Sequence, residues 1–273
     1  MQRMVTALLT LTLASSLTTG CAKQRVGAEK ALAQVFISDE QENQLGLQVK
    51  QELETKENIK YVEDPQVLEY VRGISAPILA QANKDRSGVK WKVNVINDPK
   101  TVNAFATPGG FLYVYTGLLL AADTEAELAG VMAHEAGHVV GRHSARAMIN
   151  AYGLQAITQV ALGQNPGTAA QIAAQLAGGG LQLAHGRSEE TEADEYGARY
   201  AAAAGFDPRG LITFFEKLEK QQGAQPAALK WLSTHPTNKD RIAHLQKLIA
   251  QEGLKGNRNA PGGLPAIQAK LPK

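Results

Sequence analysis

The segment His134-Glu135-Ala136-Gly137-His138 constrains the fold of this chain more than any other part of its sequence. On an α-helix, residues four apart lie on one face with their Cβ atoms about 5–6 Å apart, so both imidazoles can reach one metal ion. Glu135 projects at a neighbouring angle, within reach of a water beside that ion. The alternative is an apolar helix with two hydrogen-bonded core histidines, in which a buried Glu would be costly. A catalytic metal site needs a third protein ligand, which the fold must bring from a distant segment.

The residues before this motif predict a small sheet. Residues 91–96 and 111–117 are rich in β-branched and aromatic side chains, and residues 108–110, Pro-Gly-Gly, predict a turn between the second of these strands and residues 103–107. Most of the remaining chain has helical periodicity. The sequence therefore predicts an α+β fold that is predominantly helical, with a small β-sheet preceding the helix that carries the histidines.

Capping patterns mark the starts of the predicted helices. Ser38 and Thr124 are each followed three residues later by Gln or Glu, as in a capping box, and Asp64 precedes a Pro at a first helical position. Residues 148–186 are rich in Ala and Gly but are interrupted by Asn, Gln and a Pro-Gly turn. This pattern predicts a packed helical hairpin rather than a membrane span.

Composition bounds the domains and excludes one class of partner. With 273 residues, 44% of them hydrophobic and 20% charged, the chain can bury a substantial core. We expect this domain to occupy residues 38–253, after a polar linker at 21–37, and we expect the Pro/Gly-rich residues 254–273 to form a disordered tail. The net charge of +2 and the lack of a basic stripe give no electrostatic basis for nucleic-acid binding.

The first twenty residues predict a targeting segment. An Arg precedes an apolar run that is too short for a comfortable membrane span, and small residues lead up to Cys21, the chain's only cysteine. Gly20-Cys21 resembles the cleavage box of bacterial lipoproteins, although the box is imperfect because Thr18 occupies the place where Leu is usual. Lipid on Cys21 would anchor the protein to a membrane, and Ala22 favours the outer membrane. The alternative is a plain signal peptide with an incidental cysteine.

The best candidate for the third metal ligand lies in a predicted helix that begins with several acidic residues. Ser188 is predicted to cap this helix, and Glu190 and Asp194 are four residues apart on one of its faces. If Glu190 binds the metal, Asp194 lies on the same side and can accept the free ring N–H of a ligand histidine. Glu189 and Glu192 point elsewhere, and we expect them to be solvated. An acidic first turn favoured by the helix dipole would explain Glu190 but not the deeper Asp194.

Two further histidines are candidates for supporting roles. His143 comes five residues after His138, which rotates it away from the ligand face, so we expect a surface or supporting residue. His235 precedes a helix, next to Pro236, and we expect it near the metal. It could donate to the oxyanion of the transition state with Arg241 as a possible helper, or it could occupy the fourth metal position and block the site. A solvent-exposed histidine at a helix entry is the third possibility.

These motifs together resemble metallopeptidase family forty-eight, the HtpX-like and CAAX-prenyl-protease-like zinc peptidases of the gluzincin group. The resemblance covers roughly residues 38–253. It rests on the His-Glu-x-x-His segment, the run 190–194 after Arg187, residues 103–120 and the late His-Pro…Arg motif within 232–242. The chain lacks the transmembrane helices of the integral members, so it looks like the periplasmic, often lipid-anchored bacterial branch.

The resemblance implies a zinc-dependent endopeptidase with one Zn²⁺ ion. His134, His138 and Glu190 would hold the ion, and Glu135 would act as the general base. Substrates would pair as an added strand along the sheet edge, which corresponds here to Asn103, Ala104, Phe105 and Ala106. Unfolded or misassembled envelope proteins suit such backbone pairing, which implies a role in periplasmic quality control. The alternatives are a non-catalytic, zinc-stabilised chaperone or assembly factor for outer-membrane proteins and, less well supported, a hydrolase of small amides.

Overall fold

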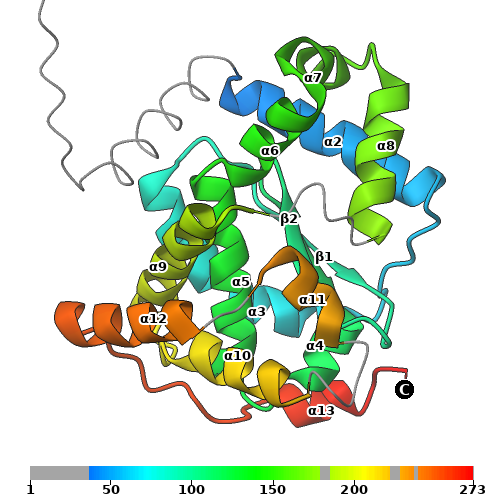
Figure 1. The fold of residues 1–273 in the computed structure, drawn as a ribbon. Helices are drawn as coiled ribbons and strands as arrows, with labels where there is room; N and C mark the ends of the chain where they lie inside the picture. Colours follow the sequence, from blue (N-terminus) through cyan, green and yellow to red (C-terminus); the bar gives the residue numbers. More distant parts are fainter. Residues whose placement is uncertain (1–36, 179–184, 222–227, 237–238, 273) are drawn as a thin grey trace, which may run out of the picture.

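The computed structural model describes residues 37–178, 185–221, 228–236 and 239–272 (Figure 1). Cys21 and the predicted targeting segment lie outside the described residues. The described helices and strands, in chain order, are α2 (Asp39–Thr55), α3 (Pro65–Asp85), β1 (Lys92–Ile96), β2 (Ala104–Thr107), β3 (Phe111–Tyr115), α4 (Thr116–Ala121), α5 (Glu125–Val140), α6 (His143–Tyr152), α7 (Leu154–Ala161), α8 (Pro166–Gly178), α9 (Arg187–Ala203), α10 (Gly210–Gln221), α11 (Ala228–Thr234), α12 (Lys239–Glu252) and α13 (Leu264–Gln268).

The predicted α+β fold, predominantly helical with a small sheet before the histidine helix, is confirmed. The sheet has the strand order β1-β3-β2, with β1 parallel to β3 and β2 antiparallel to it. Gly109 and Gly110 turn the chain between β2 and β3 at φ values of 81° and 91°, which favour glycine. The strand order leaves β2 paired on one side only, so β2 is an edge strand of the sheet.

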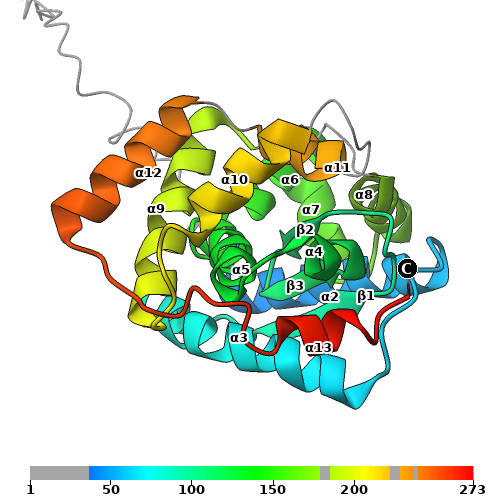
Figure 2. The ribbon, with the colours of Figure 1, turned by 90° about the horizontal axis from the view of Figure 1, so that it is seen from below.

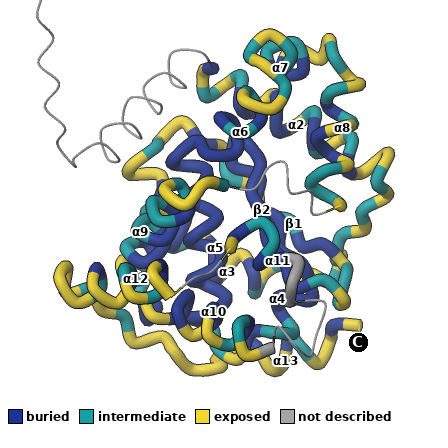
Figure 3. The backbone as a smooth tube through the Cα atoms, in the orientation of Figure 1, coloured by how far each residue is buried: buried dark blue, intermediate teal, exposed yellow. Residues whose placement is uncertain are grey.

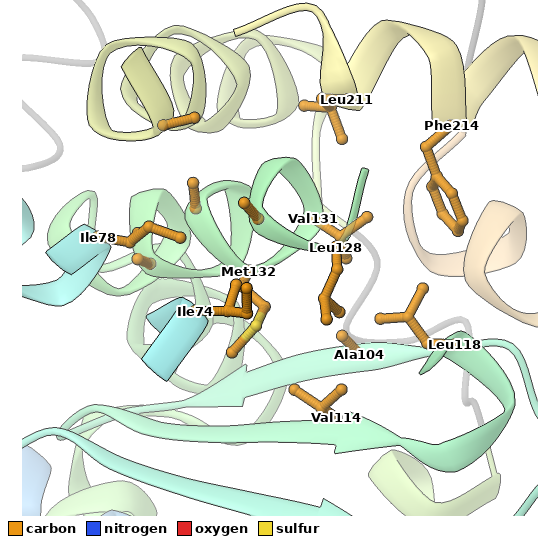
Figure 4. Packing of buried hydrophobic residues seen from close by; sticks show 14 of the residues in the cluster. Ile74, Ile78, Ala104, Val114, Leu118, Leu128, Val131, Met132, Leu211 and Phe214 are labelled. Carbon is orange, nitrogen blue, oxygen red and sulfur yellow. The ribbon is translucent and has the colours of Figure 1, made fainter. Parts of the chain in front are cut away.

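The sheet separates two apolar clusters because its side chains alternate between two faces. Leu112 and Val114 belong to the larger cluster, with residues of α3 and α5, whereas Phe111, Tyr113 and Tyr115 belong to a second cluster, with residues of α2, α7 and α8. Figure 4 shows the side chains of the larger cluster between β3 and α5. Figure 1 shows α2, α7 and α8 together on one side of the molecule.

Helix α5 lies at the centre of the molecule, with α3, α9 and α10 packed around it (Figures 1 and 2). All of its residues from Ala126 to Val140 are buried (Figure 3). Thr124 caps the helix by accepting a hydrogen bond from the backbone N–H of Glu127 at 3.2 Å. A strongly apolar, capped helix is thereby fixed on every side, which holds the histidines on it in place.

Helix α9 approaches α5 closely because both helices carry small residues at their contact. A Cβ atom at Gly197 would lie 3.0 Å from the backbone nitrogen of His134, and one at Gly137 would lie 2.8 Å from the carbonyl oxygen of Ala193. This close approach brings the acidic face of α9 beside the two histidines of the motif.

The Ala- and Gly-rich residues after α6 form two helices, α7 and α8, that pack against α2. This arrangement agrees with the predicted helical hairpin. Among the described residues, none of the helices combines the length and the hydropathy needed to cross a bilayer.

The expected disordered tail is wrong for residues 254–272. Leu264, Ile267 and Leu271 are buried in the larger cluster, and α13 packs against α3 and α4 (Figure 2). Gln268 donates hydrogen bonds of 2.9 Å to the carbonyl oxygens of Leu119 and Ala122 at the end of α4. Three apolar residues at helical spacing are enough to dock this short segment, although its Pro and Gly content predicts disorder.

Candidate metal centre

Four buried side chains from three segments converge beside the centre of α5. His134 and His138 come from α5, Glu190 from α9, and His235 from the residue that follows α11. Each is at most 2% exposed, and one nitrogen or carboxylate oxygen from each lies within 4.8 Å of the corresponding atoms of the others. The structure therefore brings together the two histidines and the distant Glu that the sequence predicts as ligands.

The spacing of these atoms fits a bound metal ion. His134 Nε2 lies 3.0 Å from His138 Nε2 and 3.5 Å from Glu190 Oε2, and His138 Nε2 lies 3.4 Å from Glu190 Oε1. Ligand atoms around a tetrahedral ion with bonds of 2.0–2.1 Å are separated by about 3.3 Å. Four ionisable groups buried at this spacing would be costly without a cation. Imidazole nitrogens with one carboxylate are a donor set suited to a first-row divalent metal.

Glu135 lies next to the ligand cluster. Its Oε1 atom is 3.3 Å from His235 Nε2. Burial raises the pKa of Glu135 to about 8, an effect that the neighbouring His134 opposes. The carboxyl group also lines a cavity of ≈ 40 Å³, which is bounded mainly by Phe105, Ala106, Met148, Leu176 and His235. The Glu135 carboxyl group thus stands beside the cluster, at the wall of a small, partly open cavity.

Asp194 occupies the position that the sequence predicts for a partner of a ligand histidine. Its Oδ1 atom lies 2.9 Å from His134 Nδ1, the ring nitrogen opposite the one in the cluster. Burial by itself lowers the pKa of His134, but the carboxylates of Asp194 and Glu190 raise it to about 9. The Asp194 contact fixes the orientation of the His134 ring. Ser188 does not cap α9, however, because the helix starts at Arg187 and Gly186 is its N-cap residue.

Arg241 holds both carboxylates of α9. Its Nε and Nη2 atoms donate to the two oxygens of Asp194 at 2.8 and 2.7 Å, and its Nη1 atom lies 2.9 Å from Glu190 Oε2. Nη1 also donates to the carbonyl oxygen of Pro236 at 2.8 Å. The guanidinium therefore supports the ligand cluster from behind.

His235 lies within the cluster, as the sequence predicts, and its ring is buried, which excludes the alternative of a solvent-exposed histidine. Its Nδ1 atom is 3.1 Å from Glu190 Oε1 and 3.3 Å from His134 Nε2. Trp231, one turn earlier, stacks on the His235 ring with centroids 5.0 Å apart. Burial lowers the pKa of His235 to about 4, against the opposing effect of Glu190. A neutral imidazole at this place can bind a metal through Nδ1.

Two histidines that the sequence does not predict to lie near the metal ligands surround His138. His143 is fully buried, so the surface alternative is wrong, and its Nδ1 atom lies 2.8 Å from His138 Nδ1. His185 stacks on the His138 ring at a centroid distance of 3.9 Å. The two acidic residues expected to be solvated have side-chain partners instead, since Glu192 lies 3.3 Å from His143 and Glu189 forms an ion pair with Arg146.

The predicted substrate-binding residues lie in and just before the edge strand β2. All four are buried, and Phe105 stacks on Tyr113 of β3. Ser144 of α6 donates a hydrogen bond of 3.0 Å to the carbonyl oxygen of Ala106. Phe105 and Ala106 also line the cavity beside Glu135, so this strand leads directly to the cluster.

A helical domain in which a His-Glu-x-x-His helix contributes two residues to a buried cluster of His, His, Glu and His is typical of metallopeptidases. Comparison with known proteins agrees, since the model of peptidase family M48 matches residues 66–249. The chain therefore belongs to peptidase family M48.

Three relatives illustrate the extent of the similarity. The metalloprotease LoiP of Escherichia coli is 30% identical over 262 residues, which cover 92% of this chain and 99% of LoiP. The mitochondrial metalloendopeptidase OMA1 of Schizosaccharomyces pombe is 35% identical over 186 residues, 68% of this chain and 54% of the relative. The β-barrel assembly-enhancing protease of E. coli is 31% identical over 191 residues, 67% of this chain and 39% of the relative. The chain thus spans about half or less of the last two proteins.

Proposed function

We propose that this protein is a zinc-dependent endopeptidase that cleaves unfolded or misassembled proteins of the bacterial cell envelope. The observation that carries the proposal is the convergence of His134, His138 and Glu190 at metal-ligand spacing, with the buried Glu135 beside them. The name of one relative, a protease that enhances β-barrel assembly, supports substrates of the envelope.

His134, His138 and Glu190 would hold one Zn²⁺ ion. When bound, zinc supplies polarisation of the scissile carbonyl and a lowered pKa for the attacking water. Glu135 accepts the proton of that water and passes it to the leaving amine. The Glu135 carboxyl group is buried beside the ligand atoms, 3.3 Å from His235 Nε2, where it can carry a proton between these two sites.

His235 is proposed as a fourth ligand that restrains the enzyme. The position of Nδ1 among the ligand atoms favours this role over that of an oxyanion donor. Hydrolysis would then require the His235 ring to leave the cluster, so that water and substrate can reach the site. A donor to the oxyanion would instead have to stand beside the cluster with an N–H directed at the substrate.

The substrate is proposed to bind in an extended form along residues 103–106. An edge strand recognises the backbone of an added strand, which depends little on sequence and suits unfolded chains. The hydrogen bond from Ser144 to Ala106 occupies one of the acceptors on this strand. The small cavity beside Glu135 would receive a side chain next to the scissile bond.

The location proposed for the protein is the periplasmic side of the outer membrane. It rests on the sequence alone, because residues 1–20 and Cys21 lie outside the described residues. Mass spectrometry of the mature N-terminus tests it, and we expect a diacylated Cys21. A free thiol at Cys21 or cleavage at another residue would reject lipid anchoring.

The experiment that tests the enzyme proposal compares casein cleavage by the wild type and by Glu135→Gln. We expect the variant to lose cleavage while it keeps one zinc ion per chain, measured by elemental analysis. Glu216→Gln is a matched control, because Glu216 is exposed on α10, and it should retain full activity. Cleavage by Glu135→Gln would reject Glu135 as the base. Envelope function that survives in cells carrying Glu135→Gln would favour the non-catalytic chaperone instead.

A further inference from the structure

We propose that His143 is a positioning residue that fixes the orientation of the ligand His138, through a hydrogen-bonded series that ends at Glu192. His143 Nδ1 lies 2.8 Å from His138 Nδ1, and His143 Nε2 lies 3.3 Å from Glu192 Oε2. All three side chains pack at the α5–α6–α9 junction, behind the ligand cluster. The inference rests on the part of the proposed function that makes His138 a zinc ligand.

The hydrogen-bond geometry determines which ring nitrogens carry protons. His138 Nε2 faces His134 and Glu190, so a metal ligated there needs its lone pair, and the ring proton must be on Nδ1. His138 Nδ1–H then donates to His143 Nδ1, which must carry a lone pair. The remaining proton of His143 is on Nε2 and donates to the Glu192 carboxylate. Each contact then has one donor and one acceptor. With the lone pair of His138 Nε2 facing the metal, the ring protons can be assigned in only this one way.

This arrangement gives His138 the same kind of support that Asp194 gives His134. A ligand histidine usually donates its free N–H to an oxygen acceptor, which fixes the ring and makes it a better ligand. For His138, the group that accepts the ring N–H is the imidazole of His143, and the carboxylate of Glu192 in turn accepts from His143. The stacking of His185 on the His138 ring further restricts the rotation of that ring.

The backbone between α5 and α6 is shaped to place His143 there. A continued α5 would carry residue 143 away from the ligand face, but the helix ends at Val140 and Arg142 has a left-handed conformation, with φ 58° and ψ 25°. Arg142 is held by the carbonyl oxygen of Ile37 at 2.7 Å and by ion pairs with Glu42 and Asp39 of α2. The chain thereby folds His143 back towards His138.

Gly141 is also required, because a side chain at this position would collide with the His143 ring. A Cβ atom at position 141 would lie 2.3 Å from His143 Nε2 and 2.7 Å from its Cε1 atom. The backbone of Gly141, at φ −70° and ψ −8°, is one that alanine adopts readily, and the three atoms nearest to an added Cβ all belong to the His143 ring. Gly141→Ala therefore displaces the His143 ring without a backbone penalty.

The test measures the zinc dissociation constant by competition with a chromophoric chelator, together with the melting temperature of the metal-free protein. His143→Leu keeps much of the ring's volume but removes the acceptor, and we expect affinity to fall roughly 10–100-fold. His143→Asn places an amide oxygen where Nδ1 stands, and we expect it to bind zinc within about 3-fold of wild type. Gly141→Ala should weaken binding as His143→Leu does.

His244→Leu is the control, because His244 pairs with Glu195 of α9 at 3.0 Å, outside the ligand cluster. We expect its zinc affinity to stay at the wild-type value. The proposal is overturned if His143→Leu binds zinc as tightly as wild type, or if His143→Asn and His143→Leu lose affinity equally. A wild-type protein that binds no zinc would reject the proposed function itself, which is a separate outcome.

Discussion

Replacement of Arg241 by Ala should destabilise the protein severely. The guanidinium is 5% exposed and pairs with Asp194 through two hydrogen bonds and with Glu190 through a third contact, and both carboxylates are at most 2% exposed. The substitution leaves two buried carboxylates without their cation, and removal of one partner of a buried pair costs about 3–5 kcal/mol. For a domain of this size, such a loss lowers the melting temperature by roughly 6–20 °C.

Chemical denaturation in the presence of a chelator measures this loss without a contribution from bound metal. Arg209→Ala is the matched control, because Arg209 also pairs with a carboxylate, Asp207 at 2.7 Å, but its side chain is 66% exposed. We expect the control to lose about 0–1 kcal/mol. The reasoning is refuted if Arg241→Ala loses no more than this exposed pair.

Three further predictions concern the cluster and the tail. His235→Ala should raise the rate of casein cleavage if His235 is a restraining ligand, whereas a loss of about 10²–10³ would identify an oxyanion donor. Zinc at about 100 times its dissociation constant should add about 2.7 kcal/mol to the unfolding free energy of the wild type, and an unchanged melting curve would contradict binding to the native state. Leu264→Ala should cost about 2–5 kcal/mol by denaturation, because this tail residue is 1% exposed, whereas Leu162→Ala, at 60% exposure, should change stability by less than about 0.5 kcal/mol. Equal losses for the two leucines would show that the tail does not contribute to the core.

The pairing of His134 with His138 and that of Glu190 with Asp194 could be predicted from sequence because each pair depends on local geometry. A spacing of four residues on a capped helix sets the relation of His134 to His138, and the same spacing relates Glu190 to Asp194. Small residues such as Gly137 and Gly197 allow the two helices to approach, which is also visible in the sequence as an Ala- and Gly-rich pattern.

The place of His143 could not be predicted because it depends on a break in the helix. Continued helical geometry turns residue 143 away from the ligands, and the left-handed Arg142 reverses that expectation. This conformation is held by α2, about 100 residues earlier in the chain, through the buried pair between Arg142 and Glu42. No local pattern around position 142 signals the contact.

The tail was mispredicted for a related reason. Composition shows that residues 254–272 are rich in Pro and Gly, but it does not show that Arg258 pairs with Glu125 at 2.7 Å. Glu125 is the first residue of α5, so the segment also contributes to the start of the central helix. Such contacts between distant segments outweigh local propensity.

The central claim is that His134, His138 and Glu190 bind zinc next to Glu135. A crystal structure of the zinc-loaded protein, with diffraction data collected on both sides of the zinc absorption edge, tests this claim most directly. We predict a single anomalous peak within about 2.0–2.2 Å of His134 Nε2, His138 Nε2 and a Glu190 oxygen. A peak at another place, or no peak between these three residues in crystals saturated with zinc, would contradict the account.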